Sequence, residues 1–297
     1  MKVYFPSYYN KFKCIAEKCR HSCCVGWEIS VDEDTLAGYS ALGESDRAEI
    51  LSHIGADGCI TLADGERCPF LRYDGLCRII ADHGEEHTSR ICREHPRFYH
   101  RVGNRVEGGI GASCEEAARI ILSCDDFADF IALERDVEVA DETNFDSLTH
   151  RSRLYDILSS QNYAQAIETI RAEYSLPDHF TLVDEWNETL CGLEYLDDSH
   201  RDVIMLVGRE EREEVQEYIK RFLAYLIFRH VSIAEHYDGL RASVGFCLLL
   251  AGIMESMTRD LGSDLDSVAE CARIISEEIE YSEDNTSSLI FEIECLI

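Results

Sequence analysis

Residues 13–27 read KCIAEKCRHSCCVGW, and this stretch decides what kind of N-terminal region the chain forms. Four of its side chains are thiols, at Cys14, Cys19, Cys23 and Cys24. Lys18 and Arg20 lie among them, and nearby cations stabilise thiolates. Because thiolates are soft ligands that suit zinc and iron–sulfur clusters, the stretch predicts a metal-binding site.

Two other interpretations of these cysteines stay open. A disulfide framework needs an oxidising compartment, and the start of the chain, MKVYFPSYYNKFKC, has neither the apolar run nor the cleavage site of an export signal. We therefore expect a cytoplasmic protein with reduced thiols. The other alternative is that the cysteines are buried structural residues, which fits poorly with polar neighbours such as His21 and Ser22.

A second group of cysteines follows at spacings of 9, 15 and 22 residues, which match no simple zinc ribbon or ferredoxin run. Together the two groups supply thiols for two four-ligand sites, or for one cluster with spare thiols. The sequence does not show which thiols pair at one site. The predicted metal ligands are Cys14, Cys19, Cys23, Cys24, Cys68, Cys77, Cys92 and Cys114.

The density of cysteines changes along the chain and predicts a domain boundary. Nine of the 14 cysteines fall in the first 114 residues. We predict a cysteine-rich metal-binding region at 1–124 and an acidic helical domain at 125–297, with the polar segment 134–146 as the linker. The predicted fold class is mainly α, with a loop-rich, metal-stapled N-terminal region that contains short β-hairpins.

Turn signals and apolar periodicity give the expected elements. Hairpin turns are predicted at Ala63-Asp64-Gly65, Tyr73-Asp74-Gly75 and Gly103-Asn104. A helix capped by Ser113 or Cys114 is expected to open with two glutamates. Further helices are expected at about 148–160, 162–173, 180–195, 209–233, 241–260 and 264–281.

Charge is distributed unevenly between the two halves. Residues 1–124 hold 15 Lys and Arg against 19 Asp and Glu, and residues 125–297 hold 13 against 39, so the net charges are −4 and −26. Such an acidic field disfavours nucleic acid and anionic membranes as partners and attracts cationic ones. The acidity is also explained if it serves solubility alone. The most apolar stretch, Val244–Met254, is too short for a membrane span and predicts a buried helix.

Several ordered blocks carry a resemblance to a known family. They are Cys14…Cys19…Cys23-Cys24-Val25-Gly26-Trp27, Cys68-Pro69-Phe70-Leu71, Gly75-Leu76-Cys77, Gly84-Glu85, Cys92-Arg93, Pro96-Arg97 and Ser113-Cys114-Glu115-Glu116-Ala117-Ala118-Arg119. Over about residues 6–122 the chain resembles the flagellin lysine-N-methylase family. It also resembles the broader group of cysteine-rich zinc- or iron-chelating proteins.

The resemblance implies a protein-lysine N-methyltransferase that transfers methyl groups from S-adenosylmethionine to lysine side chains, with flagellin as the expected protein partner. It implies a 4Fe–4S cluster, and zinc is the alternative metal. The alternative function is a non-catalytic zinc- or iron-binding module. Methyl transfer to an amine requires a neutral nitrogen and a bound sulfonium donor, but no metal, so the chemistry alone does not explain the thiols.

The sequence names no catalytic residue, but it offers candidates for donor binding. Arg93 and Arg97 lie within the motif Cys92-Arg-Glu-His-Pro-Arg97, where they are expected to offset cluster charge or hold the donor carboxylate. An ordinary ion pair with Glu94 is the alternative. The glycines of Gly108-Gly109-Ile110-Gly111 form either a donor-binding turn or a flexible connector.

Overall fold

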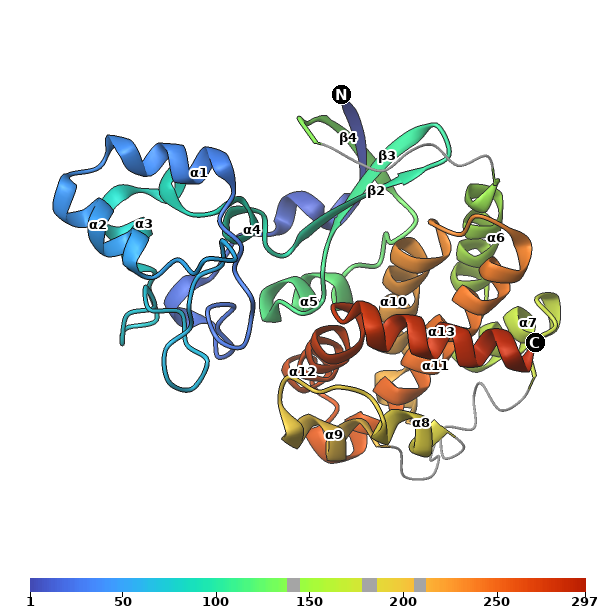
Figure 1. The fold of residues 1–297 in the computed structure, drawn as a ribbon. Helices are drawn as coiled ribbons and strands as arrows, with labels where there is room; N and C mark the ends of the chain where they lie inside the picture. Colours follow the sequence, from blue (N-terminus) through green and yellow to red (C-terminus); the bar gives the residue numbers. More distant parts are fainter. Residues whose placement is uncertain (138–144, 178–185, 206–211) are drawn as a thin grey trace. The chain divides into compact units, whose positions relative to one another are not determined.

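The computed structural model describes residues 1–137, 145–177, 186–205 and 212–297, and it divides the chain into two compact units (Figure 1). A small unit contains residues 13–96, and a large unit contains residues 1–12 and 97–297. The predicted boundary after residue 124 does not coincide with this division. The reason is that the N-terminal strand pairs with strands that follow residue 96, so the small unit is inserted within the large one.

The large unit contains a four-stranded sheet in the order β2-β3-β1-β4. Strand β1 pairs in parallel with β3, where Val3 lies opposite Val106, and antiparallel with β4. The hairpin predicted around Gly103-Asn104 is confirmed as β2-β3, whereas β1 and β4 were not predicted. The strand bounds are β1 Lys2–Pro6, β2 Arg97–Val102, β3 Arg105–Ile110 and β4 Phe130–Glu134.

Helices make up most of the large unit, which confirms a mainly α fold. Their bounds are α5 Glu115–Leu122, α6 Ser147–Ser160, α7 Tyr163–Glu173, α8 Asn187–Cys191, α9 Asp198–Ile204, α10 Gln216–Leu226, α11 Tyr237–Leu261, α12 Leu265–Ile275 and α13 Glu283–Leu296. Two π-helical turns, Ile227–Val231 and Ser276–Glu280, extend α10 and α12. Parts of the predicted linker and of the helices expected from residues 180 and 209 lie outside the described residues.

Helix α11 is the central helix of the large unit and packs against α10, α12 and α13 (Figure 1). Among the described residues it is the one helix with the length and hydropathy of a membrane span, but 83% of its most apolar window is buried inside the protein. The buried helix predicted at Val244–Met254 is therefore confirmed.

The small unit is built from short helices and turns around its own core. The helices are α1 Glu33–Gly38, α2 Glu44–Ser52, α3 Arg78–His83 and α4 Arg90–Glu94. Its core consists of eight buried side chains, which include Ile29, Tyr39, Phe70 and Cys68. In place of strands this unit has isolated antiparallel bridges, so the turns predicted near Gly65 and Gly75 form without regular hairpins.

Candidate metal centre

Four of the eight predicted ligands lie close together in the small unit: Cys24, Cys68, Cys77 and Cys92. Burial, together with the nearby thiols of the other three, raises the pKa of Cys68 to about 12. The pKa values of Cys77 and Cys92 are also raised, first by burial and then by the neighbouring Cys24. Cys24, Cys68 and Cys77 also pack in the same small core, so these thiols share a poorly solvated region.

The first two of these thiols are joined through a backbone ladder. The amide of Cys68 donates to the carbonyl of Cys24 at 2.8 Å, and Val25 bridges Arg67. Gly26 follows with φ of +78°, and its amide donates to the carbonyl of Glu66 at 3.0 Å. Because a positive φ favours glycine, Gly26 allows the Cys-Cys-Val segment to turn beside the Cys68 segment.

A tight turn brings Cys77 to the same region. Leu71 bridges Cys77, and the amide of Arg72 donates to the carbonyl of Leu76 at 2.9 Å. Gly75 closes the turn with φ of +82°, and a Cβ at this position would lie 3.4 Å from Cα of Glu17. The turn therefore packs directly against the loop between Cys14 and Cys19.

Hydrogen-bond donors surround the four sulfur atoms. Backbone amides donate to Cys68 and Cys77, and the hydroxyl of Ser89 lies 3.2 Å from the sulfur of Cys92. A hydrogen bond from Cys23 is the main reason that the pKa of Cys24 falls to about 7, and Ser22 and Arg67 lower it further. Donors and cations of this kind stabilise metal-bound thiolates.

The two predicted donor-binding arginines fall in different units. Arg93 favours the thiolate of Cys92 electrostatically, and its guanidinium donates to the carbonyls of Glu86 and Thr88. Arg97 begins β2 of the large unit, where its guanidinium lies over the ring of Phe12 at 5.2 Å. Charge compensation is thus available from Arg93, while Arg97 packs on an aromatic ring.

The other four predicted ligands make different contacts. The sulfur of Cys14 accepts from the amide of Ala16 at 3.4 Å, and Cys19 donates to the carbonyl of His21 at 2.9 Å. Cys23 contacts Cys24. Cys114 belongs to the large unit, where it occupies the N-cap position of α5 and packs against the core.

The four gathered thiols are a donor set that fits a metal group. Within the described ranges, a separate set of potential ligands is formed by His200, Glu277 and Glu278, whose ligand atoms lie within 4.8 Å of one another.

The group around His200 has a structural explanation. The buried carboxylate of Glu278 accepts from the amides of Leu196 and Asp197 at 2.7 and 3.2 Å, and lies 2.6 Å from Nδ1 of His200. These bonds use the carboxylate to hold the start of α9 against α12.

A polar centre in the large unit was missed by sequence reasoning. Arg229, His230 and Glu280 meet where the two π-helical turns face each other, with Tyr225 and Tyr281 beside them. The available signal was the polar pair Arg229-His230, which directly follows the apolar run Phe222–Phe228.

The glycine-rich segment lies in and after β3 and is buried. A Cβ at Gly109 would lie 2.5 Å from the ring of Phe98, and one at Gly111 would lie 2.0 Å from the hydroxyl of Tyr281. Aromatic side chains therefore cover this backbone, and the expected flexible connector is wrong.

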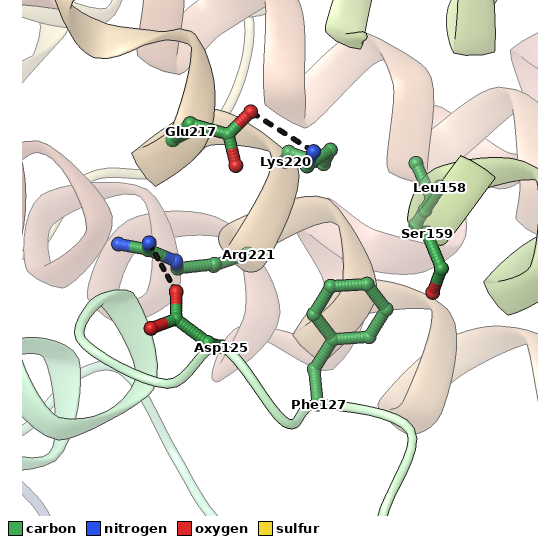
Figure 2. A pocket seen from close by; sticks show the side chains of 7 residues that line it. All are labelled: Asp125, Phe127, Leu158, Ser159, Glu217, Lys220 and Arg221. Atoms are coloured by element: carbon green, nitrogen blue, oxygen red, sulfur yellow. Dashed lines mark hydrogen bonds and ion pairs between the residues drawn. The ribbon is translucent and has the colours of Figure 1, made fainter. Parts of the chain in front are cut away.

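A shallow pocket of about 160 Å³ lies elsewhere on the large unit (Figure 2). Its charged side chains are paired, since Lys220 lies 2.9 Å from Glu217 and Arg221 contacts Asp125. Because the charges neutralise one another, we assign no ligand to it. Its lining consists of Asp125, Phe127, Leu158, Ser159, Glu217, Lys220 and Arg221.

Fold and site together define a mainly helical protein with an inserted cysteine-rich unit that gathers four thiols. The chain is 30% identical over 131 residues to a lysine-N-methylase of Salmonella typhimurium and 31% identical over 131 residues to one of Salmonella choleraesuis. Each match covers 40% of this chain and 32% of the relative. A third relative, the flagellar biosynthetic protein FliU of Salmonella muenchen, is 29% identical over 131 residues, which cover 75% of its length.

These relatives confirm the predicted resemblance to lysine-N-methylases over the matched region. The matched region spans about a third of the length of the two lysine-N-methylases. No family model matches the chain. No solved structure matches it either.

Proposed function

We propose that this chain is a protein-lysine N-methyltransferase that uses S-adenosylmethionine and acts on flagellin lysines in the cytoplasm. The names of the relatives support methyl transfer to lysine, and FliU is named for flagellar biosynthesis. The observation that carries the proposal is the group of four thiols, because it lies in the cysteine blocks on which the resemblance rests.

The proposed cofactor is a 4Fe–4S cluster held by Cys24, Cys68, Cys77 and Cys92. Four thiolates are the usual ligand number, and the surrounding amides and hydroxyls supply hydrogen bonds to sulfur. When bound, the cluster would supply a redox-capable iron centre and folding free energy for the small unit. Cys14, Cys19, Cys23 and Cys114 remain proposed as spare or exchangeable thiols.

The protein's own residues would prepare the substrate for transfer. Methyl transfer requires a neutral lysine nitrogen aligned with the sulfonium carbon, so the site must take up the ammonium proton. The acidic half would attract a lysine-bearing segment, since residues 125–297 carry a net charge of −26.

Anaerobic purification followed by metal and sulfide analysis tests the cofactor. We expect a brown protein with about four iron and four sulfide per chain. A methyl-transfer assay with isotopically labelled S-adenosylmethionine and purified flagellin tests the activity, with flagellin whose lysines are acetylated as the control. Iron-loaded protein that leaves flagellin unlabelled would refute the methylase proposal.

A non-catalytic zinc- or iron-binding module is the second candidate. The observation that favours it is the limited extent of the similarity. The matched region spans 40% of this chain and about a third of each lysine-N-methylase. Colourless protein with stoichiometric zinc, no iron and no methyl transfer would support this candidate over the first.

A further inference from the structure

The lysines of this chain are confined almost entirely to its first 18 residues. Of the 28 basic residues, five are lysines and 23 are arginines. Residues 1–18 hold four lysines and no arginine, whereas residues 19–297 hold one lysine and 23 arginines. A general preference for arginine would act evenly along the chain, so it does not explain this separation. The five lysines are Lys2, Lys11, Lys13, Lys18 and Lys220.

The difference between the two residue types lies in their chemistry rather than in their charge. Lysine and arginine carry the same charge and have similar helix propensities. The lysine amine, however, becomes a nucleophile when it loses a proton and is a usual target of methylation, whereas the guanidinium stays charged. For a protein that methylates lysines, each exposed lysine of its own is a competing acceptor. The exposed lysines that such a protein retains therefore call for a role of the amine itself.

The single lysine beyond residue 18 is shielded. The side chain of Lys220 is 12% exposed, and its Nζ lies 2.9 Å from Oε1 of Glu217 (Figure 2). The carboxylate and the surrounding side chains restrict the approach of a methyl donor to this amine. The four lysines of residues 1–18 are all exposed, so the accessible lysine amines of the chain lie in this segment.

Two of the exposed lysines, Lys13 and Lys18, are the lysines of the small unit. Lys18 ends the 3₁₀ turn Ala16–Lys18, and its amide donates to the carbonyl of Ile15 at 3.1 Å. Hydrogen bonding of this backbone restricts the position from which the Lys18 side chain extends into the solvent.

The loop that carries Lys18 packs against the candidate metal centre. A Cβ at Gly75, on the turn that leads to Cys77, would lie 3.4 Å from Cα of Glu17. Lys18 follows Glu17 directly, so its exposed side chain begins one residue from this contact. The lysine amines of the small unit therefore belong to a segment that is attached to the group of four thiols.

We propose that Lys13 and Lys18 are self-methylation sites, to which the protein transfers methyl groups from S-adenosylmethionine. This inference rests on the proposed function, because it assumes the same donor and the same lysine chemistry. The ammonium first loses a proton to water, and the neutral nitrogen then forms a bond to the methyl carbon. The carbon–sulfur bond of the donor breaks and S-adenosylhomocysteine leaves. Methylation keeps the positive charge beside Cys14 and Cys19 but removes N–H donors.

Labelling of the protein's own lysines tests the assignment. Full-length protein purified without air is incubated with S-adenosylmethionine that carries a deuterated methyl group. Mass spectrometry of its peptides then reads each lysine separately. We expect Lys13 and Lys18 to carry about 10-fold more label than Lys2 and Lys220, because methyl transfer requires an acceptor that is positioned against the donor.

Matched variants identify the acceptors. Combining Lys13→Arg with Lys18→Arg keeps both charges and removes both amines, so the label on the protein should fall by about 10-fold. Lys2→Arg removes an exposed lysine of the large unit and should leave the label unchanged. Iron content and thermal unfolding verify that the variants are folded. Wild-type protein that is heat-denatured before the donor is added should take up no label.

The outcomes also distinguish this inference from the proposed function. If the wild-type protein labels flagellin but leaves Lys13 and Lys18 unmethylated, the inference is wrong and the proposed function stands. If it labels neither flagellin nor these two lysines, both are wrong. Equal label on Lys2, Lys220 and the two proposed sites, or equal label in the heat-denatured protein, would also overturn the assignment.

Discussion

The guanidinium of Arg151 and the carboxylate of Glu107 face each other as a two-pronged pair inside the large unit. Nη2 lies 2.9 Å from Oε1, and Nη1 lies 2.5 Å from Oε2. The Glu107 side chain is fully buried, and the Arg151 guanidinium also lies over the rings of Phe130 and Phe228 at 4.8 and 5.4 Å. The pair connects β3 to α6 and so joins the sheet to the helices.

Breaking this pair should destabilise the large unit strongly. Arg151→Met would leave a buried carboxylate with one fewer partner, which typically costs about 3–5 kcal/mol. Arg153→Met, on the same helix, breaks an exposed pair with Glu173 and should cost less than about 1 kcal/mol. Chemical denaturation of both variants measures the difference, and similar losses would contradict the importance of burial.

Acid should weaken the same connection. Burial disfavours the Glu107 carboxylate, but His100 and Arg151 outweigh it and hold its pKa at about 2. Because the folded pKa is below the usual 4.5, its stabilising contribution is complete above about pH 4.5 and is lost as pH falls toward 2. Thermal unfolding between pH 5 and pH 2 should therefore show a smaller pH dependence in Glu107→Gln than in the wild type.

Cysteine substitutions should separate ligands from bystanders. Replacing Cys24, Cys68, Cys77 or Cys92 by Ala should lower iron content and expose the small unit to protease, since metal binding doubles as folding energy. Cys191 and Cys295 are exposed in the large unit, and their replacement by Ala should change neither property. Cys59, whose sulfur lies 3.5 Å from Glu28, should behave like these controls. Equal iron loss in the ligand variants and in the control variants would contradict the ligand assignment.

A methyl group at Gly111 should displace Tyr281. The added Cβ of Gly111→Ala would lie 2.0 Å from the hydroxyl, and overpacking of this kind costs about 1–3 kcal/mol. Combining Gly111→Ala with Tyr281→Phe should recover part of the lost stability because the colliding oxygen is gone. Gly192→Ala, where the nearest atom would lie 3.4 Å away, is the control. Thermal melts that show no recovery in the double variant would argue against this contact.

Salt should slow the capture of a lysine-rich substrate. Residues 125–297 carry a net charge of −26, and mobile ions screen such a field within roughly 8 Å at physiological ionic strength. We expect the association rate measured by stopped flow to fall between low and high salt, while single-turnover methyl transfer from the formed complex changes little. A capture rate that does not depend on salt would mean that the acidity serves solubility alone.

Local signals predicted the helices well. Asp146 and Asn162 cap α6 and α7 by accepting from the amides of Thr149 and Gln165, and both helices start within one residue of the expected positions. Apolar spacing also predicted α11, because a buried helix carries its pattern within its own residues. The start positions of these helices were predictable because the capping residue and the apolar periodicity indicated the same place.

Contacts between residues far apart in the sequence could not be predicted from the sequence alone. Strand β1 has five residues, and its register depends on partners near residues 106 and 132. The thiol group was predicted only as a set of eight candidates, because cysteine spacing does not state which turns bring sulfurs together. Arg229 and Glu280 escaped notice for the same reason, since 50 residues separate them and each looks ordinary in its own segment.

The insertion of residues 13–96 between β1 and β2 sets an order of events on the ribosome. Strand β1 leaves the ribosome first, but its parallel partner β3 begins only at Arg105 and its antiparallel partner β4 only at Phe130. Throughout the synthesis of about a hundred residues, the first strand therefore has no sheet to join. All seven cysteines of the small unit's candidate set emerge during this interval. If the proposed cluster forms, its iron would be needed before the sheet is complete, and cells short of iron would release chains whose first strand must find its partners around an unfilled insert.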